Sequence, residues 1–375
     1  MKRRSVALDL RILLRPNNGF GQLAINYGNY ILNNPDKIAD LDITLFVPKN
    51  YVGAFGDHVK YLEIKSLHKW CPFSYPHFDI WHSTTQVIKY LPTSSDIVRI
   101  ITVHDLNVLY EKGEIIGRKK LKKLQSVLDT ADVITAISRF TIKELERNIS
   151  LRGKLPIHNY VGKKSIVDDL ESEPSFIHKG KRFFFTIGQM LEKKNFHVLL
   201  DLMKLMPEYD LYICGEDTFD YAQNIKKRIE EENISNVFVP GMITPEEKVW
   251  MYRNCYAFLF PSKFEGFGLP IIEAMSFGKP VFSSNCSSLP EVGDKYAFFW
   301  DNFEPEHMKY LIDQNIEKFY ANDQYIKEEI DYACSFTIER HMERYLDLYR
   351  SVSLKKRTNI FKGIYNYYKF RISRL

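Results

Sequence analysis

The chain has 375 residues, more than one hydrophobic core usually serves, so we expect two domains. Hydrophobic residues make up 45% and charged residues 26%, which is ordinary for a soluble globular protein. No run of 18 apolar residues occurs, so no membrane-spanning helix is expected. Asp9 and Arg11 interrupt the apolar N-terminus, which predicts a first strand rather than a signal peptide. The five cysteines lack metal-ligand spacing, and we expect reduced thiols in the cytosol.

Positive charge is concentrated at the C-terminus. Residues 351–375 contain seven basic side chains and no acidic one, so the net charge of +5 leaves −2 for the rest of the chain. Tyrosine and phenylalanine side chains lie among these charges. A second basic cluster occupies residues 118–123. Both segments suit an anionic membrane surface, although a solvated basic face or local packing of the tail would explain them equally well.

Short β-branched and aromatic runs alternate with helical patterns along the whole chain. The strands expected in the first half are Val6–Leu14, Ile43–Val47, Ile80–Trp81, Ile100–Val103 and Val133–Ala136. The helices expected there are Gln22–Asn33, Ile116–Thr130 and Arg139–Arg147. Ser138 is expected to cap the last of these.

The alternation stops at the weakly patterned residues 159–179, which we interpret as an interdomain linker, and then begins again. The expected strands of the second half are Phe183–Ile187, Tyr209–Cys214, Val237–Val239, Ala257–Phe260 and Pro280–Ser283. Its expected helices are Phe196–Met206, Asp220–Asn233, Pro245–Asn254 and Pro270–Phe277. This order predicts an α/β protein with two parallel sheets, each covered by helices.

The most informative stretch is residues 261–282, in which two glutamates stand eight positions apart. Glu265 lies in a loop beside Gly266 and Gly268, where the lack of a Cβ lets a ligand approach the backbone. Glu273 lies in the helix that Pro270 is suited to begin. The free N–H groups of a helix start favour a phosphate, whereas carboxylates are better acceptors for sugar or ribose hydroxyls. An ordinary strand-to-helix turn would also account for a bare pair of glutamates.

Two further places in the first half carry weaker signals. Gly19-Phe20-Gly21 follows the first strand and could bring backbone N–H groups to a phosphate, or be a plain turn. His104 and Asp105 follow the strand Ile100–Val103, and ligand crevices of open α/β sheets lie at such strand ends. A histidine at a strand end is, however, often structural.

The stretch around Glu265 closely resembles the donor-binding signature of retaining glycosyltransferases of family 4. That family carries E-G-F-G-L-P, then E-A-M, G-x-P-V and S-x-L-P-E. The first three strings stand at residues 265–270, 273–275 and 278–281, and residues 288–291 match the last four positions of the fourth. The resemblance extends from Ala7 to Arg350 and excludes the basic tail.

The resemblance implies the GT-B fold, in which two Rossmann-like domains face one another across a cleft. Residues 1–165 would form an acceptor-binding domain, joined by a closing helix within residues 337–375. Residues 175–336 would form the domain that binds the nucleotide-sugar donor. Residues 337–349 resemble the family's closing helix.

The resemblance also assigns roles to residues. His104 would lie beside the transferred sugar with Glu265, and Gly19 and Gly21 would approach the donor, although Gln22 replaces a common arginine. Asp105 and His82 would touch the acceptor, but His82 could equally be a packed core histidine. The remaining donor-binding residues would be Lys193, Lys194, Gly266, Phe267, Gly268, Leu269 and Glu273. Gln189 stands where some members carry arginine.

The implied activity is transfer of a hexose-type sugar, with retained configuration, from a nucleotide-sugar to a glycan or lipid-linked glycan. The pathway implied is synthesis of cell-surface polysaccharide or lipopolysaccharide. No Asp-x-Asp stands in the cleft segments, so we expect no metal and no other cofactor. We expect a cytoplasmic location, with membrane contact through residues 351–375, and no nucleic-acid partner. The alternatives are a sugar-nucleotide-binding protein without turnover and another GT-B enzyme such as an epimerase.

Overall fold

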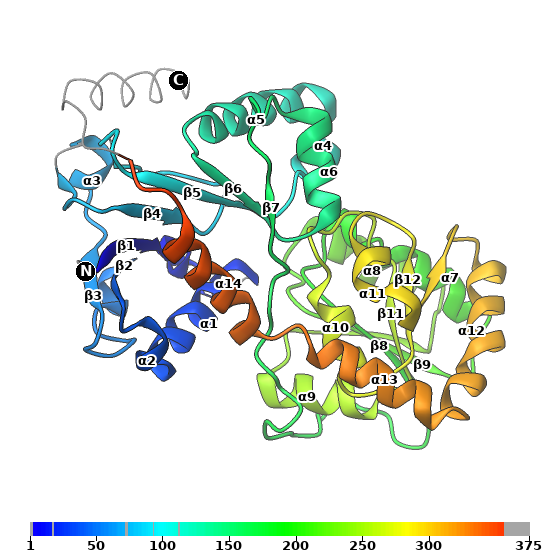
Figure 1. Cartoon of the computed structure of the whole chain (residues 1–375). Coiled ribbons are helices and arrows are strands. Elements are labelled where there is room, and N and C mark those ends of the chain that lie inside the picture. Colours follow the sequence, from blue (N-terminus) through cyan, green and yellow to red (C-terminus); the bar gives the residue numbers. More distant parts are fainter. Residues whose placement is uncertain (1–2, 17–18, 72–73, 93, 112, 356–375) are drawn as a thin grey trace. The chain divides into compact units, whose positions relative to one another are not determined.

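The computed structural model describes residues 3–16, 19–71, 74–92, 94–111 and 113–355. The chain forms two compact units, shown in Figure 1. The first unit contains residues 1–164 and 337–375, and the second contains residues 165–336. Residues 159–164 of the expected linker therefore belong to the first unit. Residues 356–375, most of the basic tail, lie outside the described residues.

The first unit is built on a seven-stranded parallel sheet in the order β3-β2-β1-β4-β5-β6-β7. Its strands are β1 Arg4–Asp9, β2 Leu41–Val47, β3 Lys60–Glu63, β4 Ile80–Ser83, β5 Val98–Val103, β6 Val133–Ala136 and β7 Ile157–His158. Its helices are α1 Gly19–Asn33, α2 Pro35–Ile38, α3 Leu67–Trp70, α4 Val108–Glu111, α5 Gly113–Asp129, α6 Arg139–Asn148 and α14 Ile338–Ser351.

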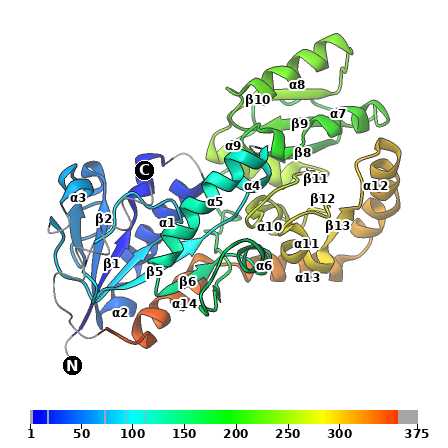
Figure 2. The ribbon, with the colours of Figure 1, turned by 90° about the horizontal axis from the view of Figure 1, so that it is seen from above.

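The second unit has a six-stranded parallel sheet in the order β10-β9-β8-β11-β12-β13, which Figure 2 shows as a continuous row. Its strands are β8 Phe183–Ile187, β9 Asp210–Cys214, β10 Val237–Gly241, β11 Ala257–Phe260, β12 Val281–Ser284 and β13 Ala297–Trp300. Its helices are α7 His197–Lys204, α8 Asp220–Glu231, α9 Pro245–Asn254, α10 Leu269–Met275, α11 Leu289–Gly293, α12 Pro305–Tyr320 and α13 Asp323–Cys334.

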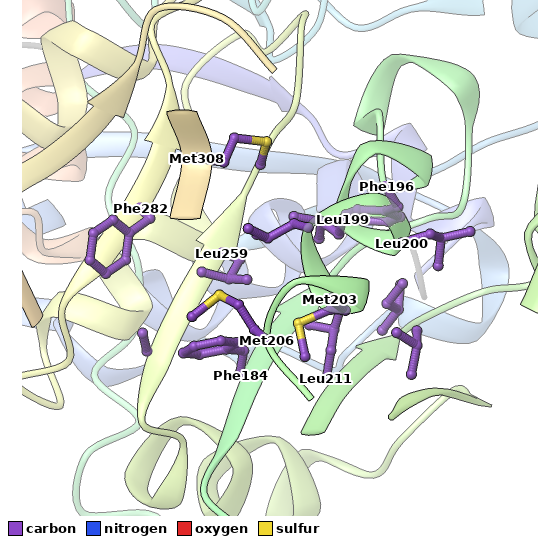
Figure 3. Packing of buried hydrophobic residues seen from close by; sticks show 14 of the residues in the cluster. Phe184, Phe196, Leu199, Leu200, Met203, Met206, Leu211, Leu259, Phe282 and Met308 are labelled. Atoms are coloured by element: carbon purple, nitrogen blue, oxygen red, sulfur yellow. The ribbon is translucent and has the colours of Figure 1, made fainter. Parts of the chain in front are cut away.

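Helices cover both faces of the second sheet because its strands are apolar on both faces. Phe184 and Leu259 belong to a buried cluster that also contains side chains of α7 and α12, seen in Figure 3. The neighbouring residues Phe185 and Phe258 point the other way and pack against Tyr252 of α9. Successive side chains of a strand alternate between faces, so this pattern places a helix layer on each side.

The expectation of two parallel sheets is confirmed, and β6, β8, β11 and α9 have the expected bounds. The expected strand Val6–Leu14 was too long. It ends at Asp9, whose Oδ1 accepts a hydrogen bond from the Arg11 N–H at 3.0 Å, and residues 11–14 form a 3₁₀ turn. A carboxylate that binds the backbone two residues later favours such a turn over an extended strand.

The helix α14 returns to the first unit, as the resemblance implied. Its Ile338 N–H donates to the Lys163 carbonyl, and Arg4 of β1 donates to the carbonyls of Tyr349 and Val352. α14 also contacts α1 and β1. A helix from the end of the sequence thus completes the core of the first unit.

Buried polar side chains of α14 form hydrogen bonds to the sheet and to α1. The Tyr349 hydroxyl lies 2.5 Å from His82 Nδ1, and the Tyr345 hydroxyl lies 2.8 Å from Thr102 Oγ1. His341 Nε2 lies 2.6 Å from the Tyr27 hydroxyl of α1. These groups are withdrawn from water, so each lost partner costs the full desolvation of the other.

We expect Tyr349→Phe to lower the free energy of unfolding of the first unit by about 1–3 kcal/mol, because His82 Nδ1 loses its partner while packing is kept. The measurement is native-state hydrogen exchange of the β4 and β5 amides, which reports the first unit by itself. The matched control is Tyr310→Phe, since Tyr310 is 61% exposed on α12 of the second unit. Equal protection of β4 and β5 in both variants would contradict the role of this bond.

Candidate functional site

Loops that follow the carboxyl ends of β8 and β11 meet through a charged pair. Lys194, at the end of a 3₁₀ turn over residues 192–194, donates from Nζ to Glu265 Oε1 at 2.6 Å. The two side chains are only 12% and 14% exposed. Adjacent parallel strands bring their carboxyl ends to one edge, which explains how residues 71 positions apart meet. The pair joins the two loops that the sequence assigned to the donor.

Serine hydroxyls fix the loop that carries Glu265. Ser262 donates to Glu265 Oε1 at 2.7 Å, and Ser287 accepts from the Glu265 N–H at 3.0 Å. Ser288 donates to the carbonyls of Glu265 and Phe267. Among the described residues, Glu265 Oε2 has no protein partner, which leaves an acceptor for a ligand hydroxyl.

Nothing in the sequence pattern alone indicates that Ser262 and Ser287 contact Glu265. Serines are common in loops, and only the fold shows that these two contact Glu265. Ser288 was part of the recognised S-x-L-P-E string, and its contact with the Glu265 loop gives that string a structural role.

The reason for glycine differs from one position to the next near the site. Gly268 has a φ of +115°, and a Cβ there would lie 2.6 Å from Leu289 Cδ2, so the turn into α10 requires glycine. At Gly21 of α1, a Cβ would lie 2.2 Å from the Arg15 carbonyl oxygen, so close packing explains that residue. Gly19 has open space around it. Gly266 and Phe267 lie in the turn that leads from β11 into α10, and Leu269 is the first residue of α10.

Glu273 lies in the second turn of α10 and faces α9. Lys248 donates to its Oε1 at 3.0 Å, and Tyr252 donates to its Oε2 at 2.8 Å. Its side chain is 16% exposed. Each carboxylate oxygen can accept a further bond, so the arrangement remains able to receive a hydroxyl. The contact between Glu273 and α9 was not foreseen from the sequence.

Lys193 contributes its backbone to the same loops, since its carbonyl accepts from the Lys263 N–H at 2.8 Å and from the Ser262 hydroxyl at 3.2 Å. Gln189 occupies the position at which some members of the resembled family carry arginine, and its side chain donates to the Glu216 carboxylate at 2.7 Å. The loop that carries Lys194 is therefore hydrogen-bonded to Ser262 and Lys263 through the Lys193 carbonyl and to Glu216 through Gln189.

In the first unit, His104 follows β5 and is 3% exposed. Its Nε2 lies 2.7 Å from the Thr84 carbonyl, so Nε2 carries the proton and Nδ1 is an acceptor. Among the described residues Nδ1 has no partner. Burial lowers the pKa of His104 to about 4, which keeps the ring neutral. Asp105 Oδ1 accepts from the Asn107 N–H and shapes the turn after the strand.

His82 is fully buried, and both ring nitrogens have partners, Tyr349 on one side and Thr102 on the other. The sequence left open whether His82 contacts the acceptor or packs in the core, and in the structure its side chain is packed in the core. Ser138 caps α6 as expected, because its hydroxyl accepts from the Thr141 N–H at 3.0 Å.

Known proteins provide a comparison for this arrangement. Residues 167–329 match the family described as glycosyl transferases group 1. The second unit belongs to the group 1 glycosyltransferase family. Because residues 165–336 form that unit, the match covers nearly all of it.

Two curated relatives come from Escherichia coli. The serotype-specific mannosyltransferase WbdA is 28% identical over 211 residues, which cover 52% of this chain and 26% of WbdA. O-antigen chain mannosyltransferase B is 28% identical over 222 residues, which cover 52% of this chain and 54% of that protein. The chain therefore matches about a quarter to a half of the length of these relatives.

Among solved structures, Anabaena HepE, determined in complex with UDP and glucose, is similar over 93% of this chain and 100% of HepE. The TM-score is 0.70 and the sequence identity is 15%, so the likeness concerns the fold. With the two parallel-sheet units, it shows that the chain has the GT-B fold. No trio of His, Cys, Asp or Glu side chains arranged for a metal occurs in the described part of the chain.

Burial lowers the pKa of His82 and of His341 to about 3, below the ordinary value of 6.5. An unfolded chain binds protons at these residues once the pH falls below 6.5, whereas the folded chain does not. Their contribution to stability is therefore full above pH 6.5 and is lost as the pH falls towards 3.

We expect NMR titration of the folded protein to show His82 and His341 neutral from pH 8 down to pH 5, with protonation only as the first unit unfolds. Circular dichroism on the same samples reports folding. A protonation midpoint near pH 6.5 in the folded protein would contradict the burial of these rings.

Proposed function

We propose that the chain is a retaining glycosyltransferase that moves a hexose-type sugar from a nucleotide-sugar to a glycan or lipid-linked glycan. The observation that carries the proposal is the pair of Lys194 and Glu265, set between the loops after β8 and β11 in a group 1 glycosyltransferase unit. The mannosyltransferase relatives support a role in cell-surface polysaccharide or lipopolysaccharide synthesis.

When the donor binds, Lys194 and Glu265 would each contact a different part of it. The diphosphate would attract the Lys194 ammonium, with Lys193 nearby, because lysine is an effective point charge for phosphate. Glu265, released from part of its pairing, would accept hydroxyls of the donor sugar. Glu273 would accept those of the ribose. Negative charge that develops on the leaving diphosphate would then be met by a positive charge already in place.

In this proposal no protein group forms a bond to the sugar. The acceptor attacks on the face from which the diphosphate leaves, through an oxocarbenium-like state, so the anomeric configuration is kept. His104, neutral and with Nδ1 available as an acceptor, would hydrogen-bond a sugar hydroxyl. Charge stabilisation by lysine makes a metal ion unnecessary for departure of the diphosphate, and we propose a metal-independent reaction.

We expect purified protein to release nucleotide slowly from one of UDP-, GDP-, ADP- or dTDP-sugars without acceptor, to the same extent with EDTA. Glu265→Gln should lower this rate by about 100-fold or more, because it removes the charge that orders the site. The control is Glu230→Gln, an exposed glutamate of α8.

The outcomes separate the alternatives. Nucleotide binding without release, with or without candidate acceptors, would indicate a sugar-nucleotide-binding protein without turnover. Conversion of the donor to an isomeric nucleotide-sugar would indicate an epimerase. Release that depends on a divalent ion would overturn metal independence, and full activity of Glu265→Gln would overturn the site.

We also propose that the protein acts at the cytoplasmic face of an anionic membrane, where a lipid-linked acceptor would reside. On α5, Lys119, Lys122 and Lys123 are exposed beside Ile115 and Ile116, which are 83% and 48% exposed. Basic side chains beside exposed apolar ones suit a peripheral membrane contact. None of the helices in the described part of the chain is long and apolar enough to cross a bilayer.

We expect the protein to float with vesicles that contain phosphatidylglycerol but not with phosphatidylcholine vesicles, and flotation should fall as salt rises. Removal of residues 356–375, or the double change Lys119→Glu and Lys123→Glu, should weaken it. Lys227→Glu, an exposed lysine of the second unit, is the control. Equal flotation of all variants would reject both membrane segments.

A further inference from the structure

A hollow of about 450 Å³ lies in the second unit at the amino ends of three neighbouring strands, β8, β11 and β12. It is lined by Lys181, Arg182, Phe183, Asn254, Cys255, Tyr256, Lys279, Glu317 and Tyr320. The proposed donor loops follow the carboxyl ends of these parallel strands. The hollow is therefore at the opposite edge of the sheet and has no part in the proposed transfer reaction. Its volume is within the range of small-molecule sites.

Three cationic side chains reach this hollow, and one of them is unpaired. Lys279 follows α10 and is half-buried, and among the described residues its ammonium has no hydrogen-bond or ion-pair partner. Lys181 is held by the Pro207 carbonyl and, at 3.4 Å, by Asp210. Arg182 lies over the Tyr256 ring at 4.4 Å and reaches Glu317 only at 3.7 Å.

The charges around the hollow nearly balance in total, but no acidic side chain among the described residues pairs with Lys279. Glu317 is the one acidic residue that lines it, and Asp210 already pairs with Lys181. α9 and α12 end here, and each helix end adds roughly half a negative charge. Glu329, near Tyr320, is fully buried without a hydrogen-bond partner, and burial raises its pKa well above the usual range, which favours the uncharged acid. Lys279 is left as a half-buried cation without an acidic side chain as a partner among the described residues.

The same hollow offers groups that bind hydroxyls. The Glu317 carboxylate is 73% exposed, and the Asn254 amide is exposed with its Nδ2 on the Trp250 carbonyl. A ligand that has both a phosphate and several hydroxyls would use both kinds of group. A lone phosphate would use only the cations.

We propose that this hollow binds a phosphorylated sugar, with its phosphate on Lys279 and Arg182 and its hydroxyls on Glu317 and Asn254. Lysine and arginine are the usual protein partners of phosphate. Carboxylate and amide oxygens accept from sugar hydroxyls. The site does not depend on the proposed transferase activity, and a variant that disables one leaves the other intact.

The test is calorimetric titration of the full chain with glucose 6-phosphate, orthophosphate and glucose as probes. We expect glucose 6-phosphate to bind more tightly than either of the others. Lys279→Glu should weaken its binding tenfold or more, and Lys279→Met should weaken it less. Glu317→Gln should weaken binding of glucose 6-phosphate but not of orthophosphate.

Two matched variants complete the test. Lys227→Glu makes the same charge change on an exposed lysine of α8, and Lys194→Met alters the donor loop. Both should leave the affinity for glucose 6-phosphate unchanged. No binding by the unaltered chain, unchanged affinity in Lys279→Glu, or loss in Lys194→Met alone would overturn the proposal. Circular dichroism identifies any variant that fails to fold, and Lys279→Met then decides.

Discussion

One ion pair, between Lys194 and Glu265, holds the loops of the candidate site together and is largely withdrawn from water. A buried charge is costly unless it is paired and hydrogen-bonded, and Glu265 is held by a lysine, a serine hydroxyl and a backbone contact. Removal of one partner would leave the other charge uncompensated. The loops after β8 and β11 are thereby held together by a hydrogen-bonded ion pair.

A different device holds the first unit together. Its sheet is covered by α14, whose buried side is held by hydrogen bonds of tyrosine and histidine groups. On the exposed side of α14, Glu343 pairs with Lys37 and Arg350 pairs with Asp40. Such bonds stabilise because each group would otherwise be buried without a partner. His82 is consequently committed to the core, whereas His104, at the end of β5, keeps a ring nitrogen without a partner among the described residues.

The sequence predicted the parallel sheets well because buried strands are short apolar runs between helical patterns, as at Phe183–Ile187 and Ala257–Phe260. It missed three edge strands. Lys60–Glu63 and Ile157–His158 have half-exposed or polar residues and weak patterns. Ala297–Trp300 is apolar, but the helix before it, Leu289–Gly293, has only five residues, so the alternation of strand and helix is weak there. The Glu265 loop could be recognised from its motif. The partners Ser262, Ser287, Lys248 and Tyr252 could not, because only tertiary packing brings them to the two glutamates.

The most direct measurement of the central claim is the shift in melting temperature of the second unit caused by UDP, GDP, ADP and dTDP, in the unaltered chain and in Lys194→Met. A ligand that binds only the folded state raises its stability, and a tighter ligand at the same concentration raises it more. The account predicts that one nucleoside diphosphate raises the melting temperature and that Lys194→Met removes most of the shift, whereas Lys279→Met keeps it. An equal shift in the unaltered chain and in Lys194→Met would contradict the assignment of these loops to the donor.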